Sequence, residues 1–503
     1  MKAITDNYFG DRLNWKRTSF VLLLLFGALI ILIPVVNHYY FRTYAFDYGA
    51  YNFAFYDYAH FSVSPNPVYP YPNTTFMQDH LSFTLFFLTP FYWLLKWSFG
   101  SYTLLIIQSL FVIWGGWASR KLIVEKTCSE LFGFLTLLLY FTLYGRYSAF
   151  SGDCNLMIIL STFVPVFLLY FERGKTWITV GCFLFLILGR ESMPLWTFFI
   201  CIFLMILNRK EREKFRLAAY LCLASVVYFI IAFKLLIPAL ESPDRPFDLF
   251  TYGKLGDTPF EALGYIFRHP INTFELLFIN QSGDPYYNGV KGEFYFVYLI
   301  SGGILLILRP YYVIAFIPII AQKMFNDFPI RWGIASYYGV EIVSLLPILV
   351  FMVLGSMKHR KIAYFLGGVA CIMSISITLY KFDPQNRTLE WAGIGKMNPF
   401  ESAFYDSEYP AKKIHKILDK IPSDARVSAT GNVVPHLALR EHIYYFPRSR
   451  GEVDYIIILN CNNHFLMSQE QLDHKIDSLS QLPIYTTIMN DKDILIFKRK
   501  AKK

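Results

Sequence analysis

Carboxylate and imidazole side chains gather in the segment YAFDYGAYNFAFYDYAHF, residues 44–61, where aromatic residues surround Asp47, Asp57 and His60. If residues 46–60 form a helix lying at a membrane surface, Asp57 and His60 share one face because they are three residues apart. Asp47 lies ten residues before Asp57, about 15 Å along a helix axis, so the two aspartates are too far apart to act as a carboxylate pair. Two interpretations of Asp47 stay open. It caps the helix that follows, or it projects into a cavity as a general base or metal ligand.

The next acids and histidine occupy turns between apolar runs. His80 and Asp79, in MQDHLSF, stand where the chain enters the next apolar run, a suitable place for a group that contacts a lipid phosphate. The alternative is that Asp79 caps the next helix and His80 only lies at the interface. Asp153, in RYSAFSGDCN, also lies between two apolar runs, where helix capping is the ordinary role of an aspartate.

An adjacent charge pair interrupts the apolar segment 177–207, where Arg190 and Glu191 of LILGRESMPLW stand in nearly uncharged sequence. Charge at membrane depth costs enough free energy that it indicates a functional site by default. A mutually neutralising pair at the tip of a helical hairpin is the alternative. The loop KMFNDFPIRWGIAS adds Lys323 and Arg331 close to a membrane surface, either as phosphate ligands or as solvated charges.

Several catalytic motifs are absent from the sequence. It holds no Walker loop, no G-x-S-x-G nucleophile elbow, no H-E-x-x-H zinc motif and no dinucleotide-binding fingerprint. These absences argue against an ATP-driven pump and against a zinc protease. The seven cysteines form no C-x-x-C pair and suggest neither a disulfide framework nor a zinc site.

The composition indicates what kind of scaffold must position these groups. The chain has 503 residues, of which 55% are hydrophobic, 19% aromatic and only 17% charged, values that are typical of an integral membrane protein. The run 19–36 is long and apolar enough to cross a bilayer as a helix. Lys2, Arg12, Lys16 and Arg17 precede it and no small-residue cleavage site follows, which predicts an uncleaved anchor with a cytoplasmic N-terminus.

Further apolar runs predict a polytopic all-α membrane domain over residues 1–380, with about 11 to 13 transmembrane helices, several of them broken or paired as half-helices. The basic connectors all fall on the inner side if the passes alternate and if 81–118, which holds two apolar runs, counts as one crossing. Orientation thus explains the net charge of +10 better than a nucleic-acid partner does. The polar segments then lie outside: residues 37–80, the turns at Asp153 and Arg190, the loops 239–293 and 323–336, and everything after 381.

The last part of the chain, residues 381–503, has lower hydropathy and mixed periodicity, which predicts a small extracytoplasmic α/β domain. We expect helices at 411–421 and 469–482, strands at 427–430, 443–446 and 454–460, and a hairpin over 485–500 that turns at Asn490 and Asp491.

The order of these segments resembles a known family. FDYGAYNFAFYD after the first span is followed by QDHLSFTLFFLTPFYWL, GRESMPLW, PYYVIAFIPIIAQKMF, ASYYGVEIVSLLPIL, and IPSDARVSATGNVVPHLALREHIYYFP with DYIIILN, over most of the chain. The set is similar to a prokaryotic family of predicted membrane proteins of unknown function. That family is placed in the GT-C glycosyltransferase superfamily of polytopic enzymes, which take sugars from lipid-phosphate donors.

This resemblance implies roles for individual residues. Asp47 matches the aspartate of the first outer loop, which serves as catalytic base. Asp153 occupies the region of a second outer-loop acid that helps to bind a metal in some superfamily members. A divalent metal ion held by Asp47 and Asp153 is therefore compatible with the resemblance, although the sequence shows no complete set of metal ligands. His80 and Glu191 match recurrent polar positions, whereas the adjacent acidic pair of several superfamily members is absent because Tyr48 follows Asp47.

The prediction as a whole is a GT-C-like glycosyltransferase of the plasma (inner) membrane. The resemblance implies a polyprenyl-phosphate-linked sugar as donor and a cell-envelope glycan, lipid or protein as acceptor, with membrane lipids around the protein and no nucleic-acid partner. The rivals are a transporter or flippase, whose charges would line a translocation path, and a non-catalytic membrane scaffold. The expected base is Asp47, and the expected substrate-binding residues are His80, Asp153, Arg190, Glu191 and Arg331.

Overall fold

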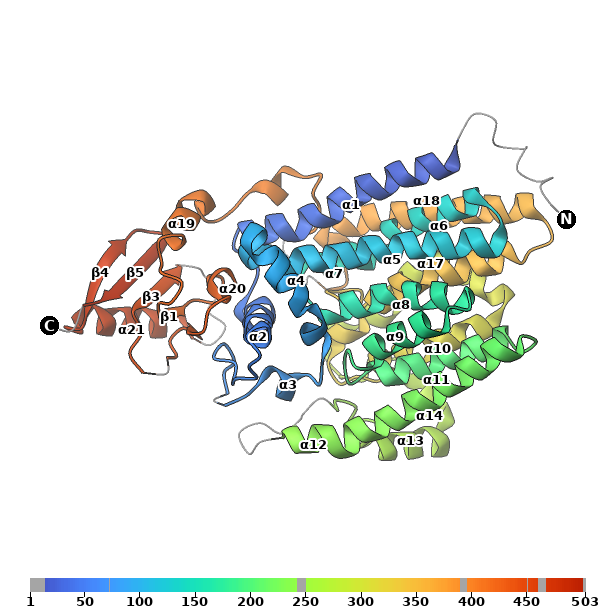
Figure 1. Cartoon of the computed structure of the whole chain (residues 1–503), viewed down its shortest axis with the longest axis horizontal. Coiled ribbons are helices and arrows are strands. Elements are labelled where there is room, and N and C mark those ends of the chain that lie inside the picture. Colours follow the sequence, from blue (N-terminus) through green and yellow to red (C-terminus); the bar gives the residue numbers. More distant parts are fainter. Residues whose placement is uncertain are drawn as a thin grey trace. The chain divides into compact units, whose positions relative to one another are not determined.

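The computed structural model describes residues 14–71, 73–241, 250–389, 396–449, 451–459 and 467–500. These residues are mostly helical and include one small sheet near the end of the chain (Figure 1). The chain forms two compact units. Unit 1 consists of Met1–Ile33, Gln108–Ala239 and Phe247–Phe404, and unit 2 of Pro34–Ile107, Leu240–Pro246 and Tyr405–Lys503.

The helices of unit 1 begin with most of α1 (Trp15–Tyr39) and α5 (Thr103–Thr127). The next are α6 (Glu130–Thr142), α7 (Tyr144–Ser151), α8 (Leu156–Glu172), α9 (Thr176–Ile187), α10 (Met193–Leu207), α11 (Arg212–Ile231), the π-helical turn η3 (Ala232–Leu236) and α12 (Ile237–Leu240). The later ones are α13 (Pro259–Arg268), α14 (Pro270–Leu276), η4 (Pro285–Tyr287), α15 (Val290–Ile300), η5 (Gly303–Leu308), η6 (Pro310–Phe316), α16 (Ile317–Met324), η7 (Pro329–Trp332), α17 (Val340–Gly355), α18 (Arg360–Phe382), η8 (Pro384–Asn386) and η9 (Ser402–Tyr405).

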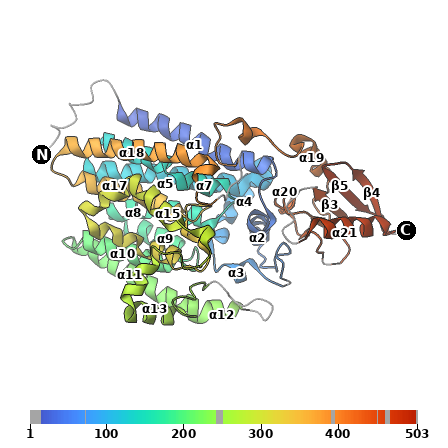
Figure 2. The same cartoon turned by 180° about the vertical axis from the view of Figure 1, so that it is seen from behind.

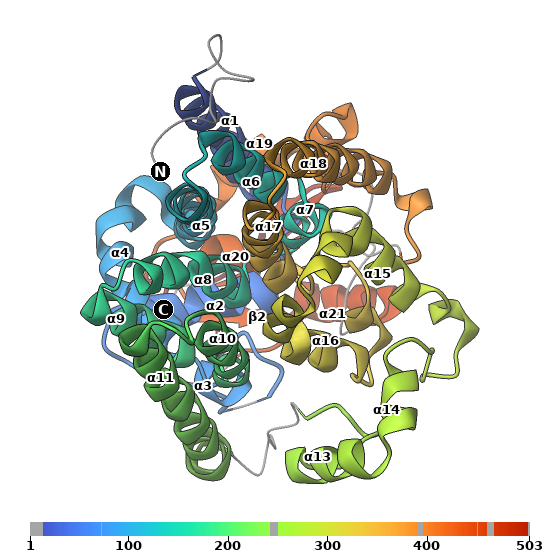
Figure 3. The same cartoon turned by 90° about the vertical axis from the view of Figure 1, so that its right-hand side faces the viewer.

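Helix α17 forms the centre of unit 1. Its residues are buried nearly all round, as expected for a helix that is apolar on every face. It packs against α6, α8 and α18, and Figure 3 shows it between them. The series α8 to α11 continues the packing, each helix against the next (Figure 2).

The apolar stretch 294–324 shows the predicted helix breaks. After α15 the chain passes through the short helices η5 and η6 before α16. Gly302 has a left-handed φ of 106°, which glycine adopts readily, and Pro310 starts η6. Both residues interrupt a continuous α-helix.

Four described helical segments have the length and hydropathy of a membrane span: Trp15–Tyr39, Thr84–Thr127, Arg212–Leu240 and Arg360–Phe382. Four shorter apolar helices, α8, α9, α10 and α17, accompany them. Several apolar helices therefore agree with a membrane protein, whereas the count of about 11 to 13 spans stays a prediction. The stretch 81–118 holds two helices, α4 (Thr84–Phe99) and α5, which are joined by η2 (Gly100–Tyr102).

Unit 2 combines helices near residue 50 with the end of the chain. Its first part holds the end of α1, the π-helical turn η1 (Ala45–Gly49), α2 (Ala50–Ala59), α3 (Phe76–Asp79) and α4. Its second part holds α19 (Ala411–Leu418), β1 (Val427–Ala429), α20 (Val434–Leu437), β2 (Ile443–Tyr445), β3 (Tyr455–Leu459), α21 (Gln469–Gln481), β4 (Tyr485–Asn490) and β5 (Ile494–Arg499).

The five strands form a mixed sheet in the order β2-β1-β3-β5-β4. Strand β1 runs parallel to β2 and β3, with Val427 opposite Ile443 and Tyr455, while β5 runs antiparallel to β3 and β4. Helix α21 packs on the sheet through Leu472 and Leu479, and Figure 1 shows the helix beside the strands. The predicted strands and the final hairpin are confirmed.

Helix α2 differs from the expectation for residues 46–60. All its residues except Tyr56 are buried in the protein, so its aromatic rings are core side chains and not a face lying at a membrane surface. Asp57 accepts a hydrogen bond from the Ser64 backbone N–H at 2.6 Å, and His60 Nδ1 lies 2.7 Å from the Tyr56 carbonyl oxygen. Asp57 and His60, which were predicted to share one helix face, therefore both form hydrogen bonds with nearby backbone groups.

Candidate functional site

Asp47 lies on the π-helical turn η1, directly before α2. The residue at the N-cap position is Tyr44, whose extended backbone (φ −127°, ψ 158°) precedes the turn without a side-chain capping bond. Asp47 is in the first turn and exposed, whereas Ala45, Tyr48 and Gly49 around it are buried. The capping interpretation of Asp47 is therefore wrong. Short π-helical turns occur frequently at functional sites.

The backbone that carries Asp47 is held by contacts within unit 2. Tyr48 donates a hydrogen bond to the Ser101 carbonyl oxygen. A Cβ atom at Gly49 would lie 2.8 Å from Val434 Cγ1, so only glycine permits this approach of η1 to α20. Asn52 Nδ2 donates to the carbonyl oxygens of Ser101 and Pro435, both at 3.2 Å. An exposed carboxylate thus stands on a fixed scaffold.

His80 follows α3 and lies beside Asp79. Its Nε2 atom is 3.8 Å from Asp79 Oδ2, which also accepts a hydrogen bond from the Tyr69 hydroxyl at 3.0 Å. Helix α4 begins only at Thr84, so Asp79 does not cap it and that alternative is wrong. The acid instead orients the neighbouring imidazole and phenol.

Asp153 lies half-buried in unit 1, between α7 and α8. The cap of α8 is Asn155, whose side chain accepts a hydrogen bond from the Met157 backbone N–H at 2.9 Å. The expectation that Asp153 is a helix cap is therefore wrong.

Arg190 and Glu191 lie in the turn between α9 and α10. Arg190 Nε is 3.1 Å from Glu191 Oε1, and the two side chains are 13% and 9% exposed. The interpretation as a mutually neutralising pair at a hairpin tip is confirmed. Because the pair is nearly buried, each charge depends on the other more strongly than in a surface ion pair.

Glu341, in the first turn of α17, was missed by the sequence analysis. Its carboxylate lies within electrostatic range of both Arg190 and Lys323. An acid in the apolar stretch 337–356 is as unusual as Glu191, so the same argument from charge at membrane depth would have found it. Unit 1 thus joins acids and bases from three separate stretches of sequence.

Lys323 has a structural role at the end of α16. Its ammonium group donates to the carbonyl oxygens of Arg331, Gly333 and Tyr338, at 2.7, 3.1 and 2.7 Å. Three acceptors use the three N–H donors of a lysine ammonium. The predicted alternatives, a phosphate ligand or a solvated charge, therefore do not describe Lys323.

Arg331 follows the same segment and is half-buried. Its Nη1 atom donates to Thr251 Oγ1 at 3.2 Å, and its guanidinium lies 5.1 Å from the centre of the Phe328 ring. These contacts orient the side chain. Among the residues that the structure describes, one of its five N–H donors forms a hydrogen bond.

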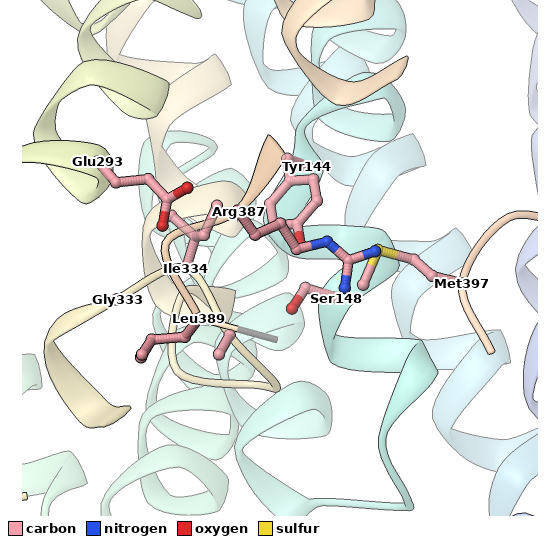
Figure 4. A pocket seen from close by; sticks show the side chains of 9 residues that line it. Tyr144, Ser148, Glu293, Gly333, Ile334, Arg387, Leu389 and Met397 are labelled. Atoms are coloured by element: carbon pink, nitrogen blue, oxygen red, sulfur yellow. The ribbon is translucent and has the colours of Figure 1, made fainter. Parts of the chain in front are cut away.

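A small cavity in unit 1 is lined by polar side chains from distant segments (Figure 4). Tyr144, Ser148, Glu293 and Arg387 face it, and Glu293 Oε1 is 2.5 Å from Lys381 Nζ. The cavity volume is about 10 Å³, which is room for about one water molecule. A sugar does not fit there, so this cavity is not the substrate site.

The residues described by the structure offer no group of three or more histidine, cysteine or acidic side chains that could hold a metal ion. Asp47 and His80 belong to unit 2, and Asp153, Arg190, Glu191 and Arg331 belong to unit 1. A metal ion held by Asp47 and Asp153 therefore stays a prediction.

A family model of predicted membrane proteins, DUF2079, matches residues 37–496. The chain belongs to this family. Members of DUF2079 are described only as predicted membrane proteins, which agrees with the apolar helices of this chain. The family expected from the order of motifs is confirmed, while its place in the GT-C superfamily stays a prediction. A comparison with curated proteins finds no match.

Proposed function

We propose that this DUF2079 protein is an integral membrane glycosyltransferase of the GT-C type. It moves a sugar from a polyprenyl-phosphate donor to a cell-envelope acceptor. The observation that carries the proposal is Asp47, an exposed carboxylate on a π-helical turn whose neighbours are buried and which it does not cap. The carboxylate is thus accessible while the backbone that carries it is held in place, as a general base requires.

In the proposed reaction Asp47 is the general base. Its carboxylate accepts the proton of an acceptor hydroxyl while the hydroxyl oxygen forms a bond to the anomeric carbon of the donor sugar. The bond from that carbon to the phosphate oxygen breaks, and its electron pair leaves with the lipid phosphate. The leaving phosphate already carries negative charge, so it needs cationic or hydrogen-bonding contacts more than a proton.

Arg190 supplies such a contact in the proposal. A guanidinium group binds phosphate oxygens through paired N–H donors, and Glu191 at 3.1 Å fixes its orientation. In the proposal the donor or acceptor is also bound by Glu191, His80, Asp153 and Arg331. The acids bind hydroxyl groups of the substrates, and Arg331 binds phosphate oxygens. No step uses a metal ion, because the described residues do not complete a ligand set.

The proposal places the protein in the plasma membrane as a multi-pass protein, with a cytoplasmic N-terminus and the sheet of unit 2 outside. The basic connectors between apolar helices support this orientation, since Lys and Arg favour cytoplasmic loops. In the proposal the donor is a lipid of the outer leaflet, and it meets the acceptor at the outer surface.

The direct test is a transfer assay with the purified full-length chain. Radiolabelled sugars on polyprenyl phosphate are supplied with a membrane extract as acceptor, and release of polyprenyl phosphate and labelling of the acceptor are followed. The proposal predicts equal amounts of both products. Binding of the lipid without either product would contradict it.

A transporter or flippase is the second candidate, because the nearly buried pair of Arg190 and Glu191 is also what a translocation path would contain. Movement of a fluorescent lipid-linked sugar across reconstituted vesicles, without chemical transfer, would favour it. If the chain neither binds nor moves the lipid, a membrane scaffold is the remaining explanation.

A further inference from the structure

An open groove in unit 2 starts where helix α1 ends. Tyr39 is the last residue of α1, and Tyr39 and Tyr40 line the groove together with residues of α19. The groove holds about 700 Å³, a size at which pockets accept small organic molecules. Apolar side chains, including Ile417 and Met489, lie in its wall.

Four lysines give the groove its charge. Lys412, Lys416 and Lys420 are spaced by four residues and so follow one face of α19 and its extension. Lys413 adds a fourth ammonium group. The opposite face of α19 is buried in unit 2 through Ala411, Ile414 and Leu418.

Most of this charge is uncompensated. Lys413 forms an ion pair with Asp491, whereas Lys412, Lys416 and Lys420 are exposed and pair with no acid in the part of the chain that the structure describes. No acidic side chain lines the groove among those residues either. The groove therefore attracts anions, and its apolar wall favours an anion with an apolar portion.

The groove also lies where an apolar helix of membrane-spanning length ends. Helix α1 has a mean hydropathy of 3.0 over its most apolar window, and its apolar character stops at Tyr39 and Tyr40. Tyrosine is enriched at membrane–water interfaces. The ammonium groups of a lysine cluster attract the anionic headgroups of lipids in a neighbouring leaflet. Because Tyr39 belongs to both features, the end of the span and the groove wall are the same place in the molecule.

We propose that this groove binds the headgroup of an anionic phospholipid from the leaflet at which α1 ends. The three unpaired lysines contact the phosphodiester and headgroup, while Ile417 and Met489 lie beside the glycerol and upper acyl region. This site is independent of the proposed glycosyl transfer, since none of its residues takes part in that reaction.

The test is native mass spectrometry of the full-length chain, released from detergent after titration with phosphatidylglycerol or with phosphatidylcholine of the same acyl chains. The wild-type chain is expected to retain phosphatidylglycerol preferentially. The combined variant Lys412→Gln, Lys416→Gln and Lys420→Gln is expected to retain it at least about tenfold less, because three ammonium contacts are lost. A matched control, Lys475→Gln, Lys498→Gln and Lys500→Gln, removes three exposed lysines elsewhere in unit 2 and should retain as much as wild type.

Equal retention by wild type and the glutamine variant, or equal retention of the two lipids, would overturn the proposal. A third variant with arginine at positions 412, 416 and 420 keeps the charge and should keep the lipid, and its failure to do so would refute the argument from charge. In a further arm, inorganic phosphate at millimolar concentration should not displace the lipid. Displacement would identify a free anion as the ligand and would also overturn the assignment.

Discussion

The hydroxyl groups of Tyr44 and Tyr445 lie 2.9 Å apart and form a hydrogen bond between residues 401 positions apart in the sequence. Tyr44 directly precedes the turn that carries Asp47, and Tyr445 ends strand β2. Phe46 adds a ring contact with Tyr445 at 4.9 Å between centroids. The position of the proposed base therefore depends on contacts with strand β2 of the sheet in unit 2.

Gly431→Ala should disturb this contact. A Cβ atom at Gly431 would lie 2.4 Å from Tyr44 Cε2, so the Tyr44 ring must move, at a cost of about 1–3 kcal/mol. We expect a lower unfolding temperature together with reduced glycosyl transfer. Gly368→Ala, where the added atom meets open space inside helix α18, is the control and should lower neither quantity, since alanine favours a helix over glycine. Normal transfer in the stable Gly431→Ala chain would show that Asp47 does not depend on this contact.

Arg190 and Glu191 should behave as a coupled pair in a double-mutant cycle. Because both side chains are nearly buried, Arg190→Gln and Glu191→Gln should each destabilise the chain, and the double variant should recover about 1–3 kcal/mol relative to their sum. Unfolding titrations in mixed micelles measure this. The exposed pair Arg216 and Glu213 is the control, with an expected coupling below about 1 kcal/mol. Additive effects at Arg190 and Glu191 would argue against the pairing.

Lys323→Met should destabilise unit 1 locally. It removes the donors of three carbonyl oxygens, and leaving buried acceptors unpaired costs at least about 2 kcal/mol. Hydrogen exchange over residues 325–339 should rise before any other segment. Lys358→Met, at an exposed position, should leave exchange unchanged. Unaltered exchange in the Lys323 variant would mean that water satisfies these carbonyls equally well.

Acid should weaken unit 2 through His436. Burial lowers the pKa of His436 well below its ordinary value of 6.5, and the neighbouring His38 and His415 lower it further. Below about pH 6.5 the unfolded chain binds a proton that the folded chain does not, so stability falls as pH falls, by at most about 1.4 kcal/mol per pH unit. Stability contributed by neutral His436 is therefore present above pH 6.5.

The measurement is the unfolding temperature of the full-length chain between about pH 7.5 and pH 5, a range that brackets histidine titration. His436→Phe keeps a ring stacked on His38, which lies 3.9 Å away between centroids, and should flatten the pH dependence. His474→Phe, on the exposed side of α21, should preserve it. Identical slopes for the wild type and His436→Phe would exclude His436 as the cause.

The sequence predicted elements well where the pattern is local. The strands of the sheet and the final hairpin follow from alternation and turn residues. The position of the helix break at Gly302 was not predicted, because it lies inside a continuous apolar run. The burial of α2 was not predictable in this way. Aromatic side chains are common both at a membrane interface and in a protein core. Burial of α2 depends on residues distant in the sequence, such as Pro435, whose carbonyl oxygen accepts a hydrogen bond from Asn52.

The candidate site was predictable in part. The ion pair between Arg190 and Glu191 was one of the two interpretations of charge in apolar sequence, while their role in binding a substrate stays a prediction. The capping role expected for Asp79 was wrong because α4 begins only at Thr84. The one expected for Asp153 was wrong because Asn155 takes the cap of α8. Such boundaries depend on tertiary packing as much as on local sequence. The hydrogen bond between Tyr44 and Tyr445 joins residues far apart in the sequence, so no local sequence pattern predicts it.

The central claim is that Asp47 acts as the general base of glycosyl transfer, and the Asp47→Asn variant of the purified chain tests it most directly. Turnover should fall at least about 100-fold, because the amide cannot accept the hydroxyl proton, while binding of the polyprenyl-phosphate sugar stays unchanged. Asp473→Asn, at an exposed position of α21, is the matched control and should retain full turnover. Wild-type turnover in the folded Asp47→Asn variant would contradict the account.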